Sequence, residues 1–152
     1  MAEVVPYREE YRADFERLNR AWIEQYFVLE EADREVFRDP AAAIIRPGGQ
    51  IFFVVDGTEV LGTCAVVPHE PGVYEIAKMA VSPEARGKGY GDLLMDATME
   101  FARRAGARRI VIVSNTVLAP AIRLYEKHGF VRVPLDAHER FVRANIRLER
   151  AP

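Results

Sequence analysis

An apolar segment runs into a glycine-rich turn and then directly into an amphipathic helix between residues 81 and 94, where the chain reads VSPEARGKGYGDLL. The glycines at 87, 89 and 91 lack Cβ atoms, so this turn can bend sharply and several N–H groups can converge on one point. The helix that follows adds unpaired N–H groups and the positive end of its dipole. The pattern predicts a phosphate or pyrophosphate site. A turn whose glycines serve only tight packing is the structural alternative.

Three kinds of phosphate-binding loop compete for this segment. The P-loop requires a Gly-Lys pair followed by Ser or Thr, whereas Lys88 lies between two glycines. The dinucleotide fingerprint requires G-x-G-x-x-G, but the third glycine falls at position 91 rather than 92, and no acidic residue ends the next apolar segment, 110–115. A third pattern, Arg86-x-x-Gly89-x-Gly91, fits the residues.

Composition limits the class of protein. The 152 residues, 49% of them hydrophobic, are enough for one folded domain, which we assign to residues 1–152. A net charge of −2 gives no basic face for nucleic acid. A single cysteine rules out an intrachain disulfide, no secretory signal is visible at the N-terminus, and no apolar run approaches the roughly 18 residues that span a bilayer. We therefore expect a cytoplasmic protein that binds neither nucleic acid nor membrane.

Hydrophobic periodicity predicts eleven elements in the order β-α-α-β-β-β-α-β-α-β-β. Antiparallel hairpins come first and a βαβ unit comes near the end, which predicts an α/β fold with three layers (αβα) and a mixed, mostly antiparallel central sheet. The expected strands are 3–8, 51–55, 60–67, 73–81, 109–114, 130–133 and 141–148; the expected helices are 15–26, 30–38, 90–104 and 121–128.

The Arg86-x-x-Gly89-x-Gly91 loop resembles the acyl-CoA pyrophosphate loop of the GCN5-related N-acetyltransferase (GNAT) superfamily. A second segment, residues 115–130 with the sequence NTVLAPAIRLYEKHGF, resembles that superfamily's "N…A…LYEKxGF" signature. The element order is also the one expected of the superfamily. The resemblance in motif extends over residues 73–130.

This resemblance implies acetyl-CoA as the cofactor and an amine as the acceptor. The pyrophosphate would lie on the backbone of the turn, and the pantetheine arm would pair with the strand before it in the manner of an added strand. The cofactor-binding residues that follow are Met79, Ala80, Val81, Arg86, Gly87, Lys88, Gly89, Tyr90, Gly91 and Asn115.

Two side chains are candidates for catalysis. Tyr125 matches the family tyrosine assigned as general acid toward the leaving thiolate, and a core aromatic residue is its structural alternative. Glu75 is the candidate base, because period-two alternation would place it on one strand face with Ala77, Met79 and Val81, toward the cleft. Its structural alternative is an ion-paired strand carboxylate. No spacing of His, Cys, Asp or Glu suggests a metal site.

The acceptor pocket is expected between the first two helices, at Tyr26, Phe27 and Glu30, whose aromatic and acidic character suits a small cationic amine. The resemblance implies an N-acetyltransferase that moves the acetyl group directly to a primary amine of a small molecule or peptide in a ternary complex. A non-catalytic acyl-CoA-binding regulatory module on the same fold is the alternative. A homodimer is possible through edge strands near the C-terminus.

Overall fold

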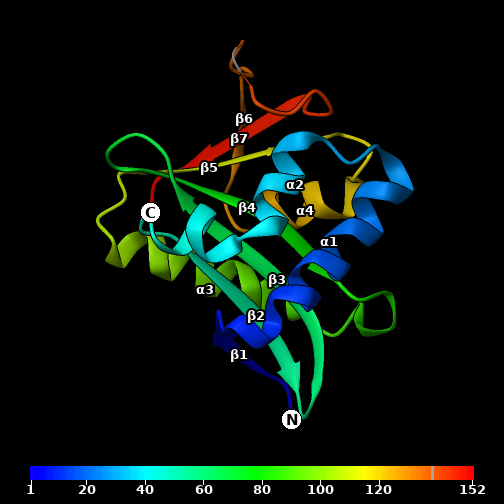
Figure 1. Ribbon diagram of the computed structural model, residues 1–152. Coiled ribbons are helices and arrows are strands. Elements are labelled where there is room, and N and C mark those ends of the chain that lie inside the picture. The colour runs from blue at the N-terminus through cyan, green and yellow to red at the C-terminus, as the bar shows by residue number, and fades with distance from the viewer. Residues whose placement is uncertain (138) are drawn as a thin grey trace.

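A computed structural model describes residues 1–137 and 139–152 of the chain. Its centre is a seven-stranded sheet with the order β1-β2-β3-β4-β5-β7-β6 (Figure 1). Within the described residues β4 and β5 pair in parallel and the other neighbours pair antiparallel, so the mixed, mostly antiparallel sheet predicted from the sequence is confirmed. The strands are β1 (Glu3–Pro6), β2 (Gln50–Asp56), β3 (Glu59–Pro68), β4 (Val73–Val81), β5 (Arg109–Ser114), β6 (Val131–Val133) and β7 (Ile146–Arg150).

The described residues form four α-helices, which cover the two faces of the sheet (Figure 1). One face carries α1 (Arg12–Tyr26) and α2 (Glu31–Arg38), and the other carries α3 (Tyr90–Arg104) and α4 (Ala119–Lys127). Short helical turns occur at Glu9–Tyr11 and Pro83–Ala85, and a π-helical turn at Ala41–Ile45. None of the helices that the described residues form is both long and apolar enough to cross a membrane.

The sheet separates two hydrophobic cores, because successive side chains of a strand point to opposite faces. In β2, Phe53 packs in the core with α1 and α2, whereas Phe52 and Val54 pack in the core with α3 and α4. The continuous apolar run of β5 is likewise buried, with Ile110, Val111 and Ile112 almost fully covered. The three-layer arrangement predicted from the sequence follows from these two cores.

β4 departs from regular geometry in its middle. Its pairing with β3 steps from Ala65 opposite Ala77 to Thr63 opposite Ala80, so one residue of β3 faces two of β4. This is a β-bulge. Lys78, at the bulge, has a φ of 55°, and it is the one residue other than glycine with a positive φ among those described. The bulge turns the end of β4 relative to its beginning.

β4 also separates from β5. Their parallel pairing extends from Val73 opposite Arg109 to Glu75 opposite Val111 and then stops, although β4 continues to Val81. β5 instead continues its pairing with β7 as far as Ser114. The two strands therefore diverge beyond Glu75, and the candidate functional site described below lies in the opening between them.

The chain near the C-terminus differs from the expected strand at 141–148. Regular pairing begins only at Ile146, and the strand continues to Arg150. The backbone N–H groups of Val142 and Arg143 donate instead to the carboxylate of Glu30, at 3.0 and 3.3 Å. A side chain 112 residues away thus takes the hydrogen bonds that strand pairing would have used, and this segment turns toward α2.

Candidate functional site

A cleft of about 600 Å³ fills the opening between β4 and β5 and continues between α1 and the segment before β7. One end is the glycine-rich turn, and the other is an aromatic wall from the end of α1 and from Phe141. Of the predicted site residues, all line this cleft except Lys88 and Glu30. Segments far apart in the sequence therefore meet in one site.

The glycine-rich turn has the geometry of an anion site. Gly87 and Gly89 have φ angles of 79° and 81°, in the left-handed region that favours glycine. A Cβ atom on either residue would meet no heavy atom within 4 Å, so these glycines do not serve packing. Gly89 is the N-cap of α3 and makes no side-chain cap, which leaves the first N–H groups of the helix directed at the turn.

Gly91 has a different role. A Cβ atom there would lie 3.0 Å from Leu124 Cδ2, so this glycine allows α4 to approach the first turn of α3. Asp92 in the same turn accepts from Lys127 at 2.9 Å and contacts His128 Nε2 at 2.8 Å. These contacts, Lys127 first, lower the pKa of Asp92. Gly91 therefore serves close packing, which was the structural alternative for the glycines of this turn. Its missing side chain lets α4 lie beside the turn.

The opening between β4 and β5 exposes backbone groups of Met79, Ala80 and Val81. These residues pair with β3 on one side, at Thr63 opposite Ala80 and Gly62 opposite Val81, and have no β5 partner on the other. An extended, amide-rich chain could pair there as an added strand. Across the opening, Asn115 follows β5; its amide donates to Arg143 O at 2.7 Å, and its carbonyl accepts from Val117 N at 2.8 Å.

Tyr125 comes from α4 and enters the cleft from the α3 side of the sheet. Its side chain is 7% exposed and belongs to the core, as the packing alternative suggested, yet it also lines the cleft. Burial raises the pKa of its phenol above the usual value. The hydroxyl is therefore protonated at neutral pH and available as a hydrogen-bond donor.

Glu75 lies at the point where β4 and β5 part, but the alternation predicted for β4 is wrong. Ile76 packs in the core with α3 and α4, whereas Ala80, also even-numbered, packs in the core with α1 and α2. The bulge at Lys78 reverses the alternation, so Glu75 faces the α1 and α2 side while Met79 packs toward α3. All of them still reach the cleft, because it opens through the edge of β4.

The carboxylate of Glu75 has a histidine partner. Glu75 Oε1 contacts His69 Nε2, from the loop between β3 and β4. This hydrogen bond raises the pKa of His69, against the lowering effect of partial burial. His69 was not singled out in the sequence, since a loop histidine six residues from a strand carboxylate carries no pattern.

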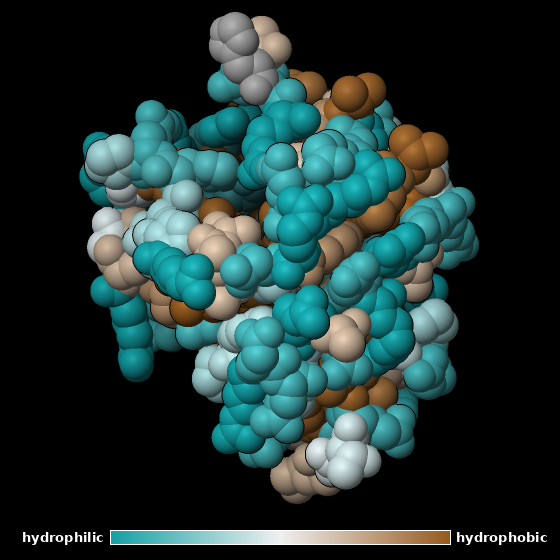
Figure 2. Space-filling model, in the orientation of Figure 1, coloured by the Kyte–Doolittle hydropathy of each residue, from teal (hydrophilic) through white to brown (hydrophobic). Residues whose placement is uncertain are grey.

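The aromatic wall at the far end of the cleft is continuous. Tyr26 and Phe27 have ring centroids 6.3 Å apart, and Phe27 lies 6.4 Å from Trp22 in an edge-to-face contact. Tyr26 is about half exposed, and Figure 2 shows hydrophobic side chains at the upper right of a face that is otherwise mostly hydrophilic. Of the three residues predicted to form the acceptor pocket, Tyr26 and Phe27 line the cleft and Glu30 does not.

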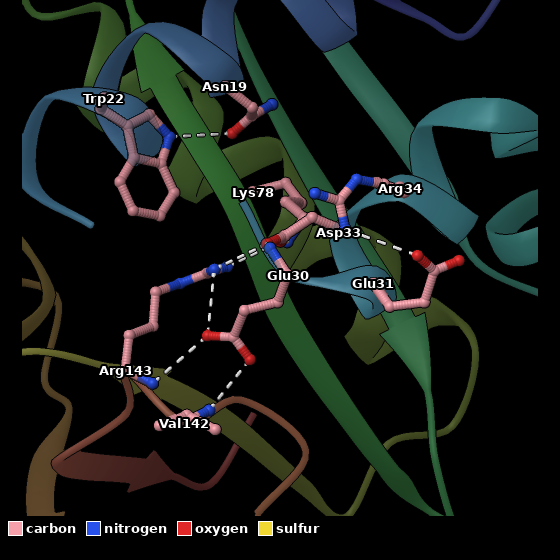
Figure 3. Close-up of polar contacts among 9 residues, drawn as sticks. All are labelled: Asn19, Trp22, Glu30, Glu31, Asp33, Arg34, Lys78, Val142 and Arg143. Atoms are coloured by element: carbon pink, nitrogen blue, oxygen red, sulfur yellow. Dashed lines mark hydrogen bonds and ion pairs between the residues drawn. The ribbon is translucent and has the colours of Figure 1, made fainter. Parts of the chain in front are cut away.

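Behind this wall lies a buried charge network of Glu30, Asp33, Lys78 and Arg143 (Figure 3). Asp33 is fully buried and accepts two hydrogen bonds from the Arg143 guanidinium, both at 2.7 Å, and one from Lys78 Nζ at 2.5 Å. Glu30 caps α2 in a reciprocal capping box with Asp33. Its carboxylate also accepts hydrogen bonds from the backbone N–H groups of Val142 and Arg143, which precede β7. The network ties α2, the β4 bulge and that segment together.

The pKa values of the network follow from burial and pairing. Burial alone would raise the pKa of Asp33, but Arg143 and Lys78 outweigh it and hold that pKa well below its usual range. Burial lowers the pKa of Lys78, and the charge of Asp33 partly opposes this. The sequence signal for the network was weak: a Glu-x-x-Asp capping pattern at the start of α2 was visible, but its partners lie 45 and 110 residues away.

Comparison with known proteins identifies relatives. The family model described as Acetyltransferase (GNAT) family matches residues 7–130. A mycothiol acetyltransferase of Geodermatophilus obscurus is 30% identical over 129 residues, which cover 81% of this chain and 39% of that protein. An uncharacterized N-acetyltransferase of Schizosaccharomyces pombe is 30% identical over 123 residues, which cover 77% of this chain and 74% of that protein. The chain spans only 27% to 39% of the length of the mycothiol acetyltransferases it matches.

Solved structures share the fold. A GNAT-family acetyltransferase from Staphylococcus aureus superimposes with a TM-score of 0.90 at 14% identity, covering 99% of both chains. A structure from Salmonella typhimurium with its cofactor acetyl-CoA has a TM-score of 0.75 at 16% identity, covering 99% of this chain and 94% of the other. At these identities the likeness establishes the fold.

Gly89→Ala tests the anion site against a matched control, Gly57→Ala in the β2–β3 turn. Both glycines have positive φ angles and open space around Cβ, so each change should cost about 1–2 kcal/mol of folding stability. Only Gly89→Ala should weaken acetyl-CoA binding, by about tenfold or more. Isothermal titration of both variants measures this. Equal affinities in the two variants would remove the turn from the binding site.

Asp33→Asn should destabilise the fold, because it leaves two buried cations beside Glu30 alone. We expect a loss of about 3–5 kcal/mol in the free energy of unfolding near pH 7. Since the pKa of Asp33 is lowered in the folded state, its contribution is complete above the unfolded pKa of about 4 and is lost progressively as the pH falls from there toward the lowered folded pKa. The difference from wild type should therefore shrink in acid.

Urea unfolding between pH 3 and pH 7 measures that difference. Glu31→Gln, an exposed acid on the same helix, is the control and should change stability by less than about 0.5 kcal/mol. An Asp33→Asn variant as stable as Glu31→Gln would contradict the role of the network.

Proposed function

The chain belongs to the acetyltransferase (GNAT) family, and from this premise we propose that it transfers an acetyl group from acetyl-CoA directly to a primary amine of a small molecule or peptide. The observation that supports this most directly is that three features line one cleft: the glycine-rich turn, backbone on β4 that β5 leaves unpaired, and the side chains of Tyr125 and Glu75. These features suit a ligand with a pyrophosphate, an amide-rich arm and a reactive end.

Acetyl-CoA when bound supplies the acetyl group as an activated thioester. Residues 86–91 would bind its pyrophosphate through backbone N–H groups, since Gly87 and Gly89 leave the turn open. Residues 79–81 would bind its arm through main-chain hydrogen bonds on the side that β5 leaves free. Asn115 supports this wall by fixing the segment before β7 through Arg143 O.

Tyr125 would donate a hydrogen bond from its hydroxyl to the departing sulfur. A phenol has an ordinary pKa near 10, above the 8.5 of a thiol, and burial raises it further. Complete proton transfer to the thiolate is therefore uphill. We assign Tyr125 mainly to orienting the sulfur and to stabilising the charge that develops on it.

Glu75 would accept a proton from the acceptor amine, which must be neutral to attack. An alkylammonium with a pKa near 10 is almost fully charged at pH 7. The Glu75 carboxylate lies in the cleft wall, and its contact with His69 leads toward solvent through a side chain that is 38% exposed. This pair offers the proton an exit on the α1 and α2 face of the sheet.

Direct transfer is favoured over a covalent acyl-enzyme by the state of Cys64. Its thiol is fully buried and lies 3.7 Å from both Ala65 O and Ala77 O, and burial raises its pKa far from the thiolate range. A buried, protonated thiol is a poor nucleophile. Initial-velocity measurements with both substrates varied should give intersecting lines, and parallel lines would indicate a covalent intermediate.

A screen of amine acceptors with release of free CoA thiol as the readout tests the proposal. Thermal shifts with acetyl-CoA, ATP and NAD accompany it, because a ligand that binds the native state stabilises it. Stabilisation by acetyl-CoA with transfer to some amine supports the proposal. Stabilisation by acetyl-CoA without transfer to any amine would instead indicate a binding module.

Tyr125→Phe should lower kcat by about 10²-fold or more while acetyl-CoA affinity stays near wild type, because it removes only the hydroxyl. Tyr74→Phe on β4 is the matched control and should retain full turnover, since Tyr74 does not line the cleft. Single-turnover kinetics and titration with acetyl-CoA separate the two effects. Unchanged kcat in Tyr125→Phe would refute the role of its hydroxyl.

Glu75→Gln should lower kcat/KM for the acceptor by about 10²-fold near pH 7. The deficit should narrow as the pH rises toward the pKa of the acceptor amine, because more of the amine is then already neutral. Glu70→Gln, in the loop outside the cleft, is the control. A pH–rate profile in which the deficit is the same at every pH would argue against proton removal by Glu75.

A further inference from the structure

The acceptor end of the cleft is the end at the aromatic wall of Trp22, Tyr26, Phe27 and Phe141, and the described residues give it no unpaired negative charge. Among the described residues that line the cleft, the acidic side chains are Glu75 and Asp92. Asp92 lies in the first turn of α3, at the opposite end, and is paired with Lys127 and His128. Glu75 is paired with His69 and, in the proposed function, serves the reacting amine. A second cationic group on an acceptor would find no carboxylate of its own.

Glu30, the acid that the sequence suggested for a cationic acceptor, and Asp33 three residues later are both already neutralised. Asp33 and Glu30 carry two negative charges, and Lys78 and Arg143 carry two positive ones, so the network has no net charge. Both oxygens of Asp33 accept from Arg143, and both oxygens of Glu30 accept backbone N–H groups (Figure 3). The members that line the cleft are the cations, Lys78 and Arg143.

The aromatic wall is also occupied by cations. Lys78 Nζ and Arg143 Cζ each lie 4.5 Å from the centroid of Phe141, and Arg143 Cζ lies 5.6 Å from the centroid of Trp22. Phe141 and Trp22, two of the rings that could attract an ammonium group, are therefore already in contact with protein cations. Phe27 and Tyr26 add apolar surface beside them.

We propose that the acceptor is a primary monoamine whose remaining body is apolar, and that Arg143 is a specificity-determining residue that discriminates against diamines and polyamines. This inference rests on the proposed acetyl transfer at the same cleft. The apolar body gains contact with Trp22 and Phe27 and leaves water. A second ammonium would lose hydration and approach Lys78 and Arg143, which repel it.

Hexylamine and cadaverine (1,5-diaminopentane) form a matched pair of probes, because a terminal methyl group in one replaces an ammonium group in the other. With wild-type protein and saturating acetyl-CoA, kcat/KM for hexylamine should exceed half of the kcat/KM for cadaverine, which has two amines, by about tenfold or more. An equal or higher value for cadaverine would overturn the inference. Transfer to other amines but to neither probe would overturn it as well.

Arg143→Gln tests the assigned residue. The change leaves Asp33 and Glu30 with a single cation, Lys78, so the acceptor end gains one negative charge. The preference for hexylamine over cadaverine should then fall by about fivefold or more. Arg140→Gln is the matched control: Arg140 also lies over Phe141, at 5.5 Å, but makes no ion pair with Asp33 or Glu30, and its removal should keep the wild-type ratio.

An unchanged ratio in Arg143→Gln, with acetyl-CoA stabilisation showing that the variant is folded, would contradict the role of Arg143. If the variant does not fold, the wild-type ratio alone decides the acceptor class. Failure of the proposed function gives a different result, namely no thiol release with any amine. Failure of this inference gives thiol release in which cadaverine is at least as good an acceptor as hexylamine, or in which other amines react but neither probe does.

Discussion

Parallel pairing between β4 and β5 stops after Glu75 and Val111, and the site depends on this separation. Buried backbone N–H and C=O groups are normally paired, so a strand that leaves its neighbour inside a sheet needs other partners for them. On β4 the groups of residues 79–81 face the cleft. A ligand with its own amides can satisfy them, which is why an open sheet can be both stable enough to fold and selective for an extended, amide-rich chain.

Other contacts must keep the two strands apart. α4 lies against α3 through the absence of a side chain at Gly91 and through Asp92, and this fixes one wall of the opening. On the opposite face Asp33 binds Lys78 at the β4 bulge and Arg143 before β7. A left-handed φ at a lysine is costly and persists where surrounding contacts determine it, and the buried ion pair is such a contact. The cleft is thus braced from both sides of the sheet.

Local patterns were sufficient to predict the order of the elements along the chain, the three layers and the glycine-rich turn before α3, because period-two runs, glycine spacing and caps act within a few residues of one another. They failed where a distant partner prevailed. The expected strand over 141–148 lost its first half to Glu30, and the alternation of β4 was reversed by a bulge that nothing near Lys78 announces. The same limit explains why Glu30 was expected to face the acceptor: its partners are more than a hundred residues away.

A buried ion network is an expensive way to join three elements, since apolar side chains of similar volume often give equal or greater stability. Apolar side chains in place of Asp33 and Glu30 would, however, leave the charges of Lys78 and Arg143 uncompensated. The cleft wall would then carry a net positive charge. Asp33 and Glu30, neither of which lines the cleft, together cancel those two charges from behind while leaving Lys78 and Arg143 against Phe141. The acceptor end is therefore apolar toward the body of a ligand and repulsive toward a second cation. Glu75 is then the one carboxylate in that part of the cleft, among the residues described, that can meet an ammonium group.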